Sequence, residues 1–195
     1  MRFFRKLGLS IAVLAFCAAP ALARNLVGKV VELDAMPPPT ASSIAPNDPN
    51  QLFYLQRSSN SNTIVYAANL TKPGQIDRNN PLDIFWRRYT EDGRREGLSF
   101  MQRTLAYGSS PKAVVGHPDE FDASVVSLPE LKFHIAINAE GNPEATVQMG
   151  GRLARLVSAY VKVDESGLIP KLVFLDIYGI DKATGRVLHQ HLEPG

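Results

Sequence analysis

Residues 131–138 read Leu-Lys-Phe-His-Ile-Ala-Ile-Asn, with a large apolar side chain at every odd-numbered position. Successive side chains of a β-strand point to opposite faces, so this alternation predicts a strand with one buried and one polar face. Pro129 precedes the stretch and Glu140-Gly141-Asn142-Pro143 follows it, and both are turn signals. The stretch therefore indicates a β protein.

Short β-prone runs bounded by turn-forming residues lie on both sides of this stretch. They occupy residues 51–57, 63–70, 82–89, 121–128, 145–149, 172–178 and 186–192. Residues 152–163 fit a helical face as well as a strand, but a β-branched end and the turn Glu165-Ser166-Gly167 favour a strand. We predict a mainly β (β-rich α+β) fold, an antiparallel sandwich or barrel of about eight strands.

One helix is predicted near residues 96–107, packed against the strands. Leu98, Met101 and Leu105 are spaced as one apolar stripe of a helix, and Gly108 follows as a stop signal. We expect this helix to cover one open end or face of the β-structure.

Residues 1–23 have the three parts of a secretory signal peptide. These parts are the basic residues Arg2, Arg5 and Lys6, an apolar run over residues 7–16, and the small-x-small site Ala21-Leu22-Ala23. The apolar run is about half of the roughly 20 residues that a membrane span needs, so we expect no transmembrane anchor in the mature chain. Lipidation of Cys17 is the alternative, but the bulky Phe16 precedes it where a small residue is needed. We expect a periplasmic or secreted protein, cleaved near Ala23.

Removal of the leader changes the charge of the chain. The full sequence has 21 Lys and Arg against 19 Asp and Glu, and three of the basic residues lie in the leader. The mature chain is therefore near neutral, with 18 basic and 19 acidic residues, and we expect it to bind no nucleic acid. The single cysteine also leaves with the leader, which excludes a thiol nucleophile, a cysteine-ligated metal and a disulfide.

Residues 24–50 are predicted to form a proline-rich arm or linker, and residues 51–195 a single globular domain. Five of the fourteen prolines lie within residues 35–50, which contain few large apolar side chains. The short apolar run at residues 26–31 is compatible with an edge strand.

The sequence contains no familiar catalytic or cofactor-binding motif, so we predict no cofactor and favour a protein that is not an enzyme. His189 and His191 are two residues apart in a predicted strand and therefore lie on the same face. Two imidazoles at this spacing bind a metal ion if a third ligand approaches, and His134 or Asp176 are the candidates. The alternative is a pair of solvated histidines.

Two further groups are candidate ligand-binding residues. Arg87 and Arg88 follow Trp86, and guanidinium groups beside aromatic rings bind phosphate or carboxylate. Arg57, Ser59 and Asn60 belong to a polar turn whose hydroxyl and amide groups suit sugars or anions. A charged surface and an ordinary hairpin turn explain the same residues without any ligand.

Four segments resemble a known family. They are Phe53 to Tyr66, Asn80-Pro81-Leu82 through Trp86, Leu98 to Gly108, and Gly179 to Gly185. Together they resemble an uncharacterised bacterial exported family, domain of unknown function 4833, over about residues 51–194. The resemblance implies an exported or envelope-associated domain and carries over no catalytic residues.

Three hypotheses for the function follow from these observations. The first is a non-catalytic binding module for a small ligand or an envelope partner. The second is a hydrolase or metal-dependent enzyme with a site around His189 and His191. The third is a protein–protein interaction module, which would expose an apolar patch or an open edge strand. The oligomeric state is left open.

Overall fold

The computed structural model describes residues 26–38, 44–57, 61–167 and 171–195. Strands dominate it, and the prediction of a mainly β fold is confirmed. The strands are β1 (Leu26–Leu33), β2 (Gln51–Arg57), β3 (Thr63–Ala68), β4 (Leu70–Lys72), β5 (Gln75–Ile76), β6 (Leu82–Arg87), β7 (Arg95–Gly97), β8 (Lys112–Val114), β9 (His117–Val125), β10 (Leu128–Ile137), β11 (Pro143–Met149), β12 (Arg152–Asp164), β13 (Lys171–Asp181) and β14 (Val187–Pro194). The helical segments in the described part of the chain are α1 (Phe100–Gln102) and the π-helical turn η1 (Arg103–Tyr107).

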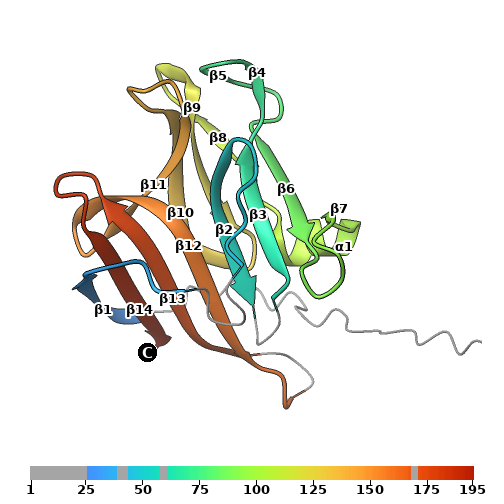
Figure 1. The fold of residues 1–195 in the computed structure, drawn as a ribbon, viewed down its shortest axis with the longest axis vertical. Helices are drawn as coiled ribbons and strands as arrows, with labels where there is room; N and C mark the ends of the chain where they lie inside the picture. The colour runs from blue at the N-terminus through green and yellow to red at the C-terminus, as the bar shows by residue number, and fades with distance from the viewer. Residues whose placement is uncertain (1–25, 39–43, 58–60, 168–170) are drawn as a thin grey trace, which may run out of the picture.

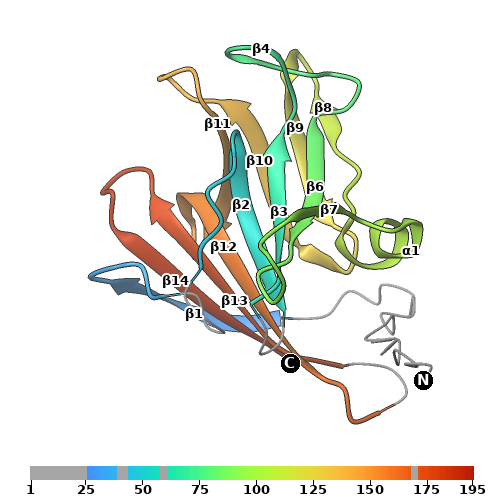
Figure 2. The ribbon, with the colours of Figure 1, turned by 45° about the vertical axis from the view of Figure 1, so that its right-hand side comes forward.

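Twelve of the strands form one sheet, which curls into a half-barrel (Figure 1 and Figure 2). Its longest path has the order β7-β6-β3-β2-β12-β11-β10-β9-β8, while β13, β14 and β1 continue from the other edge of β12. The long strand β12 is therefore a junction: β11 and then β2 pair along one edge, and β13 pairs along the other. Among the described pairings, only the one between β2 and β12 is parallel.

Aromatic rings fill the concave side of the half-barrel. Phe53 on β2 and Tyr66 on β3 stack with their ring centroids 4.4 Å apart. Phe133 on β10 packs edge-on against Phe53 at 4.9 Å, so the two arms of the curled sheet meet through these rings. All three side chains are buried, which gives the domain a packed core between its arms.

The helix is shorter than predicted, and the side chains that it buries are not the predicted ones. The helix begins only after Ser99, which caps its N-terminus. Residues Arg95–Gly97 pair with β6 as strand β7 and do not join the helix. Met101, expected in the buried stripe, is 44% exposed, whereas Tyr107 is buried. The Tyr66 hydroxyl donates a hydrogen bond to the Tyr107 carbonyl at 2.7 Å, so the helix end is tied to the sheet.

The segment before β2 also belongs to the folded unit. β1 pairs with β14 along its whole length, from Leu26 opposite Pro194 to Leu33 opposite Val187. Further along, the Asp48 carboxylate accepts hydrogen bonds from the Arg87 guanidinium. The predicted leader and Cys17 lie outside the described residues. In the part of the chain that is described, no helix has the length and apolar character needed to cross a membrane.

Candidate functional site

Four neighbouring strands, β2, β12, β13 and β14, place eight side chains in two rows on the side of the sheet away from the aromatic core. Residues directly opposite each other in paired strands lie on the same face, so the pairing register defines both rows. The first row is Tyr54, Ser158, Tyr178 and His189, and the second is Gln56, Tyr160, Asp176 and His191. We call these eight residues the tyrosine–histidine face.

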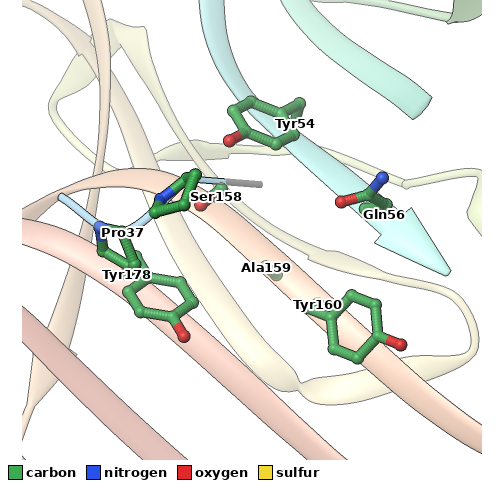
Figure 3. Close-up of a pocket in the computed structure, with 8 residues that line it drawn as sticks. Pro37, Tyr54, Gln56, Ser158, Ala159, Tyr160 and Tyr178 are labelled. Carbon is green, nitrogen blue, oxygen red and sulfur yellow. The ribbon is translucent and has the colours of Figure 1, made fainter. Parts of the chain in front are cut away.

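This face has a covered end and an open end. At the β2 end Tyr54, Gln56, Ser158 and Tyr160 are buried, and the segment 37–38 lines a small pocket with them (Figure 3). The cavity volume is about 10 Å³, which is room for about one water molecule. Towards β14 the face opens, since the side chains of His189 and His191 are 22% and 42% exposed.

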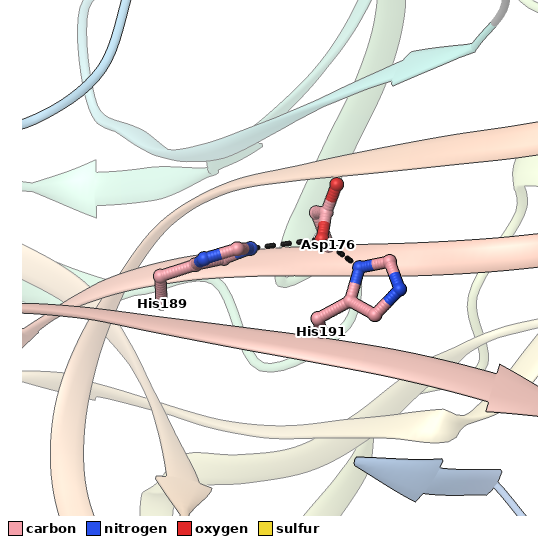
Figure 4. A group of neighbouring side chains, drawn as sticks. All are labelled: Asp176, His189 and His191. Atoms are coloured by element: carbon pink, nitrogen blue, oxygen red, sulfur yellow. Dashed lines mark hydrogen bonds and ion pairs between the residues drawn. The ribbon is translucent and has the colours of Figure 1, made fainter. Parts of the chain in front are cut away.

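At the open end, one carboxylate lies between two imidazoles (Figure 4). Asp176 Oδ1 is 2.8 Å from His189 Nε2 and 2.7 Å from His191 Nδ1. The other ring nitrogen of His191, Nε2, is 3.1 Å from Glu193 Oε1. The Tyr178 ring stacks on the His189 ring at 4.6 Å and 8°, which restricts how that imidazole turns.

The carboxylates at the open end, together with burial in the case of the tyrosines, favour the protonated forms of the neighbouring histidine and tyrosines. Hydrogen bonds that the His191 ring donates to Asp176 and Glu193 raise the pKa of His191 above its ordinary value, although partial burial opposes this shift. Burial, and then the charge of Asp176, raises the pKa of the Tyr160 and Tyr178 phenols. Both tyrosines are therefore neutral hydrogen-bonding groups at physiological pH.

The structure does not bring His134 to this cluster. His134 lies on β10, and the three strands β11, β12 and β13 separate β10 from β14. Along the sheet this is four strand spacings of about 4.8 Å, and His134 is not among the residues whose donor atoms converge at the open end of the face. His134 instead contacts Asp122 at 3.0 Å and Glu120 at 3.3 Å. Of the two third ligands considered from sequence, Asp176 is the one in place.

The arginine candidates are engaged in ion pairs within the chain. Arg87 pairs with Asp48, and Arg57 pairs with Glu165. Arg88 pairs with Glu96 at 2.8 Å, and its guanidinium lies 4.5 Å from the centre of the Trp86 ring. Each of the three guanidinium groups is therefore engaged by a carboxylate of the same chain. Ser59 and Asn60 lie outside the described residues.

The three tyrosines of the face were not predicted from the sequence. Tyr54, Tyr160 and Tyr178 lie in three separate strands, and nothing local to each strand marks them as neighbours. The available signal is weak: each tyrosine occupies a position in a strand run where alternation directs it away from the core.

Comparison with known proteins adds the family. Residues 53–191 match the family described as Domain of unknown function (DUF4833). The chain belongs to the DUF4833 family. The DUF4833 match covers most of the chain and includes all eight residues of the tyrosine–histidine face. No curated protein and no solved structure matches the chain.

Proposed function

We propose that this DUF4833 protein is an exported, non-catalytic binding module for a small ligand or an envelope partner. The ligand binds at the open end of the tyrosine–histidine face. The observation that carries the proposal is the register of β2, β12, β13 and β14, which aligns aromatic rings and hydrogen-bonding groups in two rows. Rings with a polar tip bind molecules that have both apolar and polar surface.

The packed core supports a ligand that lies across the sheet rather than inside it. Phe53, Tyr66 and Phe133 occupy the space between the arms of the half-barrel. The pocket under Pro37 and Pro38 holds about 10 Å³, whereas pockets for drug-sized ligands measure roughly 300–1,000 Å³. We therefore expect a flat or extended ligand that contacts Tyr178, His189 and His191 from solvent.

The edge of the sheet beside this face suits a protein partner. β1 pairs only with β14 among the described strands, and Val31 of β1 lies opposite His189. Val27 and Val31 are 67% and 38% exposed. An envelope protein that adds a strand to this edge would contact the open end of the face as well.

A metal-dependent hydrolase is the second candidate function, because Asp176 contacts both His189 and His191. A catalytic site is normally concave, and the small pocket of the face reaches Tyr178 but includes neither histidine. This placement favours binding over catalysis. Assays of ester and phosphoester hydrolysis with added Zn²⁺ separate the two functions: turnover that is lost in His189→Gln supports the enzyme.

A thermal-shift screen of sugars and lipids on the purified, EDTA-treated protein tests the binding function. We expect at least one class to raise the melting temperature, and Tyr178→Ala to reduce that shift. Phe100→Ala is the matched control, since Phe100 is an aromatic residue 77% exposed on α1, away from the face. No response from any class, together with no co-purifying partner, contradicts the proposal. Equal losses in the two variants contradict the assigned position of the site.

A further inference from the structure

We propose that Asp176, His189 and His191 form a binding site for a divalent transition-metal ion such as Zn²⁺. The site shares His189 and His191 with the proposed ligand-binding surface, but it follows from the donor atoms and their immediate neighbours and not from that function. The three residues come from two paired strands: Asp176 lies directly opposite His191, and His189 is two residues further along β14 on the same face.

The donor atoms already converge. One donor atom from each of the three residues lies within 4.8 Å of the other two. Around a tetrahedral ion with bonds of about 2.0–2.1 Å, neighbouring donors are about 3.3 Å apart. Asp176 Oδ1 is 2.8 Å from His189 Nε2 and 2.7 Å from His191 Nδ1, so these two pairs must open by only about half an ångström. We expect side-chain rotations, rather than movement of either strand, to supply this change.

The surroundings orient the ligands as those of known metal sites do. A metal-bound histidine usually donates its second ring N–H to a carboxylate or carbonyl, which fixes the ring and its tautomer. Glu193 Oε1, 3.1 Å from His191 Nε2, occupies this position. Tyr178, stacked on His189, holds the second imidazole.

The charge and composition of the site select the class of cation. Two imidazoles and one carboxylate suit zinc, copper, nickel or iron, whereas calcium and magnesium prefer all-oxygen ligand sets. Asp176 and Glu193 supply negative charge, and Lys29, at the β1 position opposite His191, is exposed to solvent. Three protein ligands on a partly open face leave a coordination position for water or a bound molecule.

A second histidine–carboxylate cluster provides a matched comparison. His134 contacts Glu120 and Asp122, and His117 contacts Glu120 at 3.2 Å. In the described part of the chain, only Asp176, His189 and His191 bring three such donor atoms together. The cluster around His134 has the same residue types and therefore controls for nonspecific attraction of a cation.

Isothermal titration of the untagged, EDTA-treated protein with Zn²⁺ tests the site. We expect Asp176→Asn, His189→Gln and His191→Gln each to weaken binding by at least about tenfold, and Glu193→Gln by about tenfold. His134→Gln should bind Zn²⁺ as the parent protein does. Melting temperatures measured without metal confirm that each variant is folded.

The imidazole NMR signals of the parent protein give a readout that needs no variant to fold. The chain has four histidines, so each ring can be followed separately during the titration. Shifts of the His189 and His191 rings before those of His117 and His134 support the site. Earlier shifts of His117 and His134, unchanged affinity in the His189 and His191 variants, or a dissociation constant weaker than about 1 mM overturn it.

Discussion

Replacing Tyr66 with Phe removes one hydroxyl group from the centre of the fold and leaves the aromatic stack in place. The hydroxyl donates to the Tyr107 carbonyl at 2.7 Å, and the Tyr66 side chain has no exposed surface. Burial raises the pKa of this phenol well above its ordinary value, with a smaller contribution from Tyr107, so the group is a neutral donor at neutral pH.

The substitution destabilises the fold because the Tyr107 carbonyl loses its hydrogen-bond donor. A buried acceptor left without its donor costs about 1–3 kcal/mol, partly offset because the hydroxyl is no longer desolvated. We expect Tyr66→Phe to lower the free energy of unfolding by about 1–2 kcal/mol, which is roughly 3–6 °C in melting temperature for a chain of this size.

Urea unfolding measures this cost, with an unchanged m-value as the check that only stability has changed. Tyr178→Phe is the matched control, since its ring keeps the stacking on His189, and its effect should stay within about 0.5 kcal/mol. Amide exchange gives a local readout: the Ser127 N–H, bonded to the Ala106 carbonyl beside the helix end, should exchange faster in Tyr66→Phe. A loss below about 0.5 kcal/mol, or no change at Ser127, refutes the reasoning.

Three further predictions concern the arm, the closing turn and the leader. Asp48→Ala leaves the half-buried Arg87 without its carboxylate, and should cost about 1–3 kcal/mol and speed proteolysis between β1 and β2. Burial raises the pKa of Asp181, but hydrogen bonds from two backbone N–H groups and from Arg152 outweigh burial and lower this pKa. The stabilisation by the Asp181 carboxylate is therefore complete above the ordinary pKa of 3.8 and is lost as the pH falls below that value. We expect Asp181→Asn to lose less stability on acidification than the parent protein. We expect export to leave a chain that begins at residue 24, and mass spectrometry of the N-terminus measures this.

Each of these predictions has its own control. Asp119→Ala breaks the exposed pair with Arg78 and should cost at most about 1 kcal/mol; an equal effect of Asp48→Ala contradicts a special role for the arm contact. Parallel acid unfolding curves for the parent protein and Asp181→Asn contradict the assigned pKa direction. Retention of residue 1, or a lipid on Cys17, contradicts cleavage near Ala23.

The longer strands were predictable because their signal is local, whereas the short strands β5, β7 and β8 were not predicted. Alternation at residues 131–138 predicts β10, and the β-branched end of residues 152–163 correctly favours strand over helix in β12. The predicted start of the helix was wrong because residues 95–97 pair with β6, and the spacing of apolar residues along the chain does not reveal this contact. The π-helical turn at Arg103–Tyr107 also shifts which side chains are buried.

The candidate site was predictable only in part. The spacing of His189 and His191 places both imidazoles on one face of a strand, and the structure has them there. The choice of Asp176 over His134 as their neighbour depends on the register of β13 against β14, which the sequence of either strand alone does not specify. The tyrosine rows depend on the parallel pairing of β2 with β12, whose residues are about a hundred positions apart.

The junction strand β12 also determines when the sheet can be completed. β2 finds its parallel partner only when β12 is present, and β1, the first strand described, pairs only with β14, the last. Such distant pairings place the chain among slow-folding topologies, with expected times of milliseconds to seconds. The strands β2, β3, β6 and β7 can pair with one another as soon as they are made, but β1 lacks its partner strand until the last residues of the chain are available.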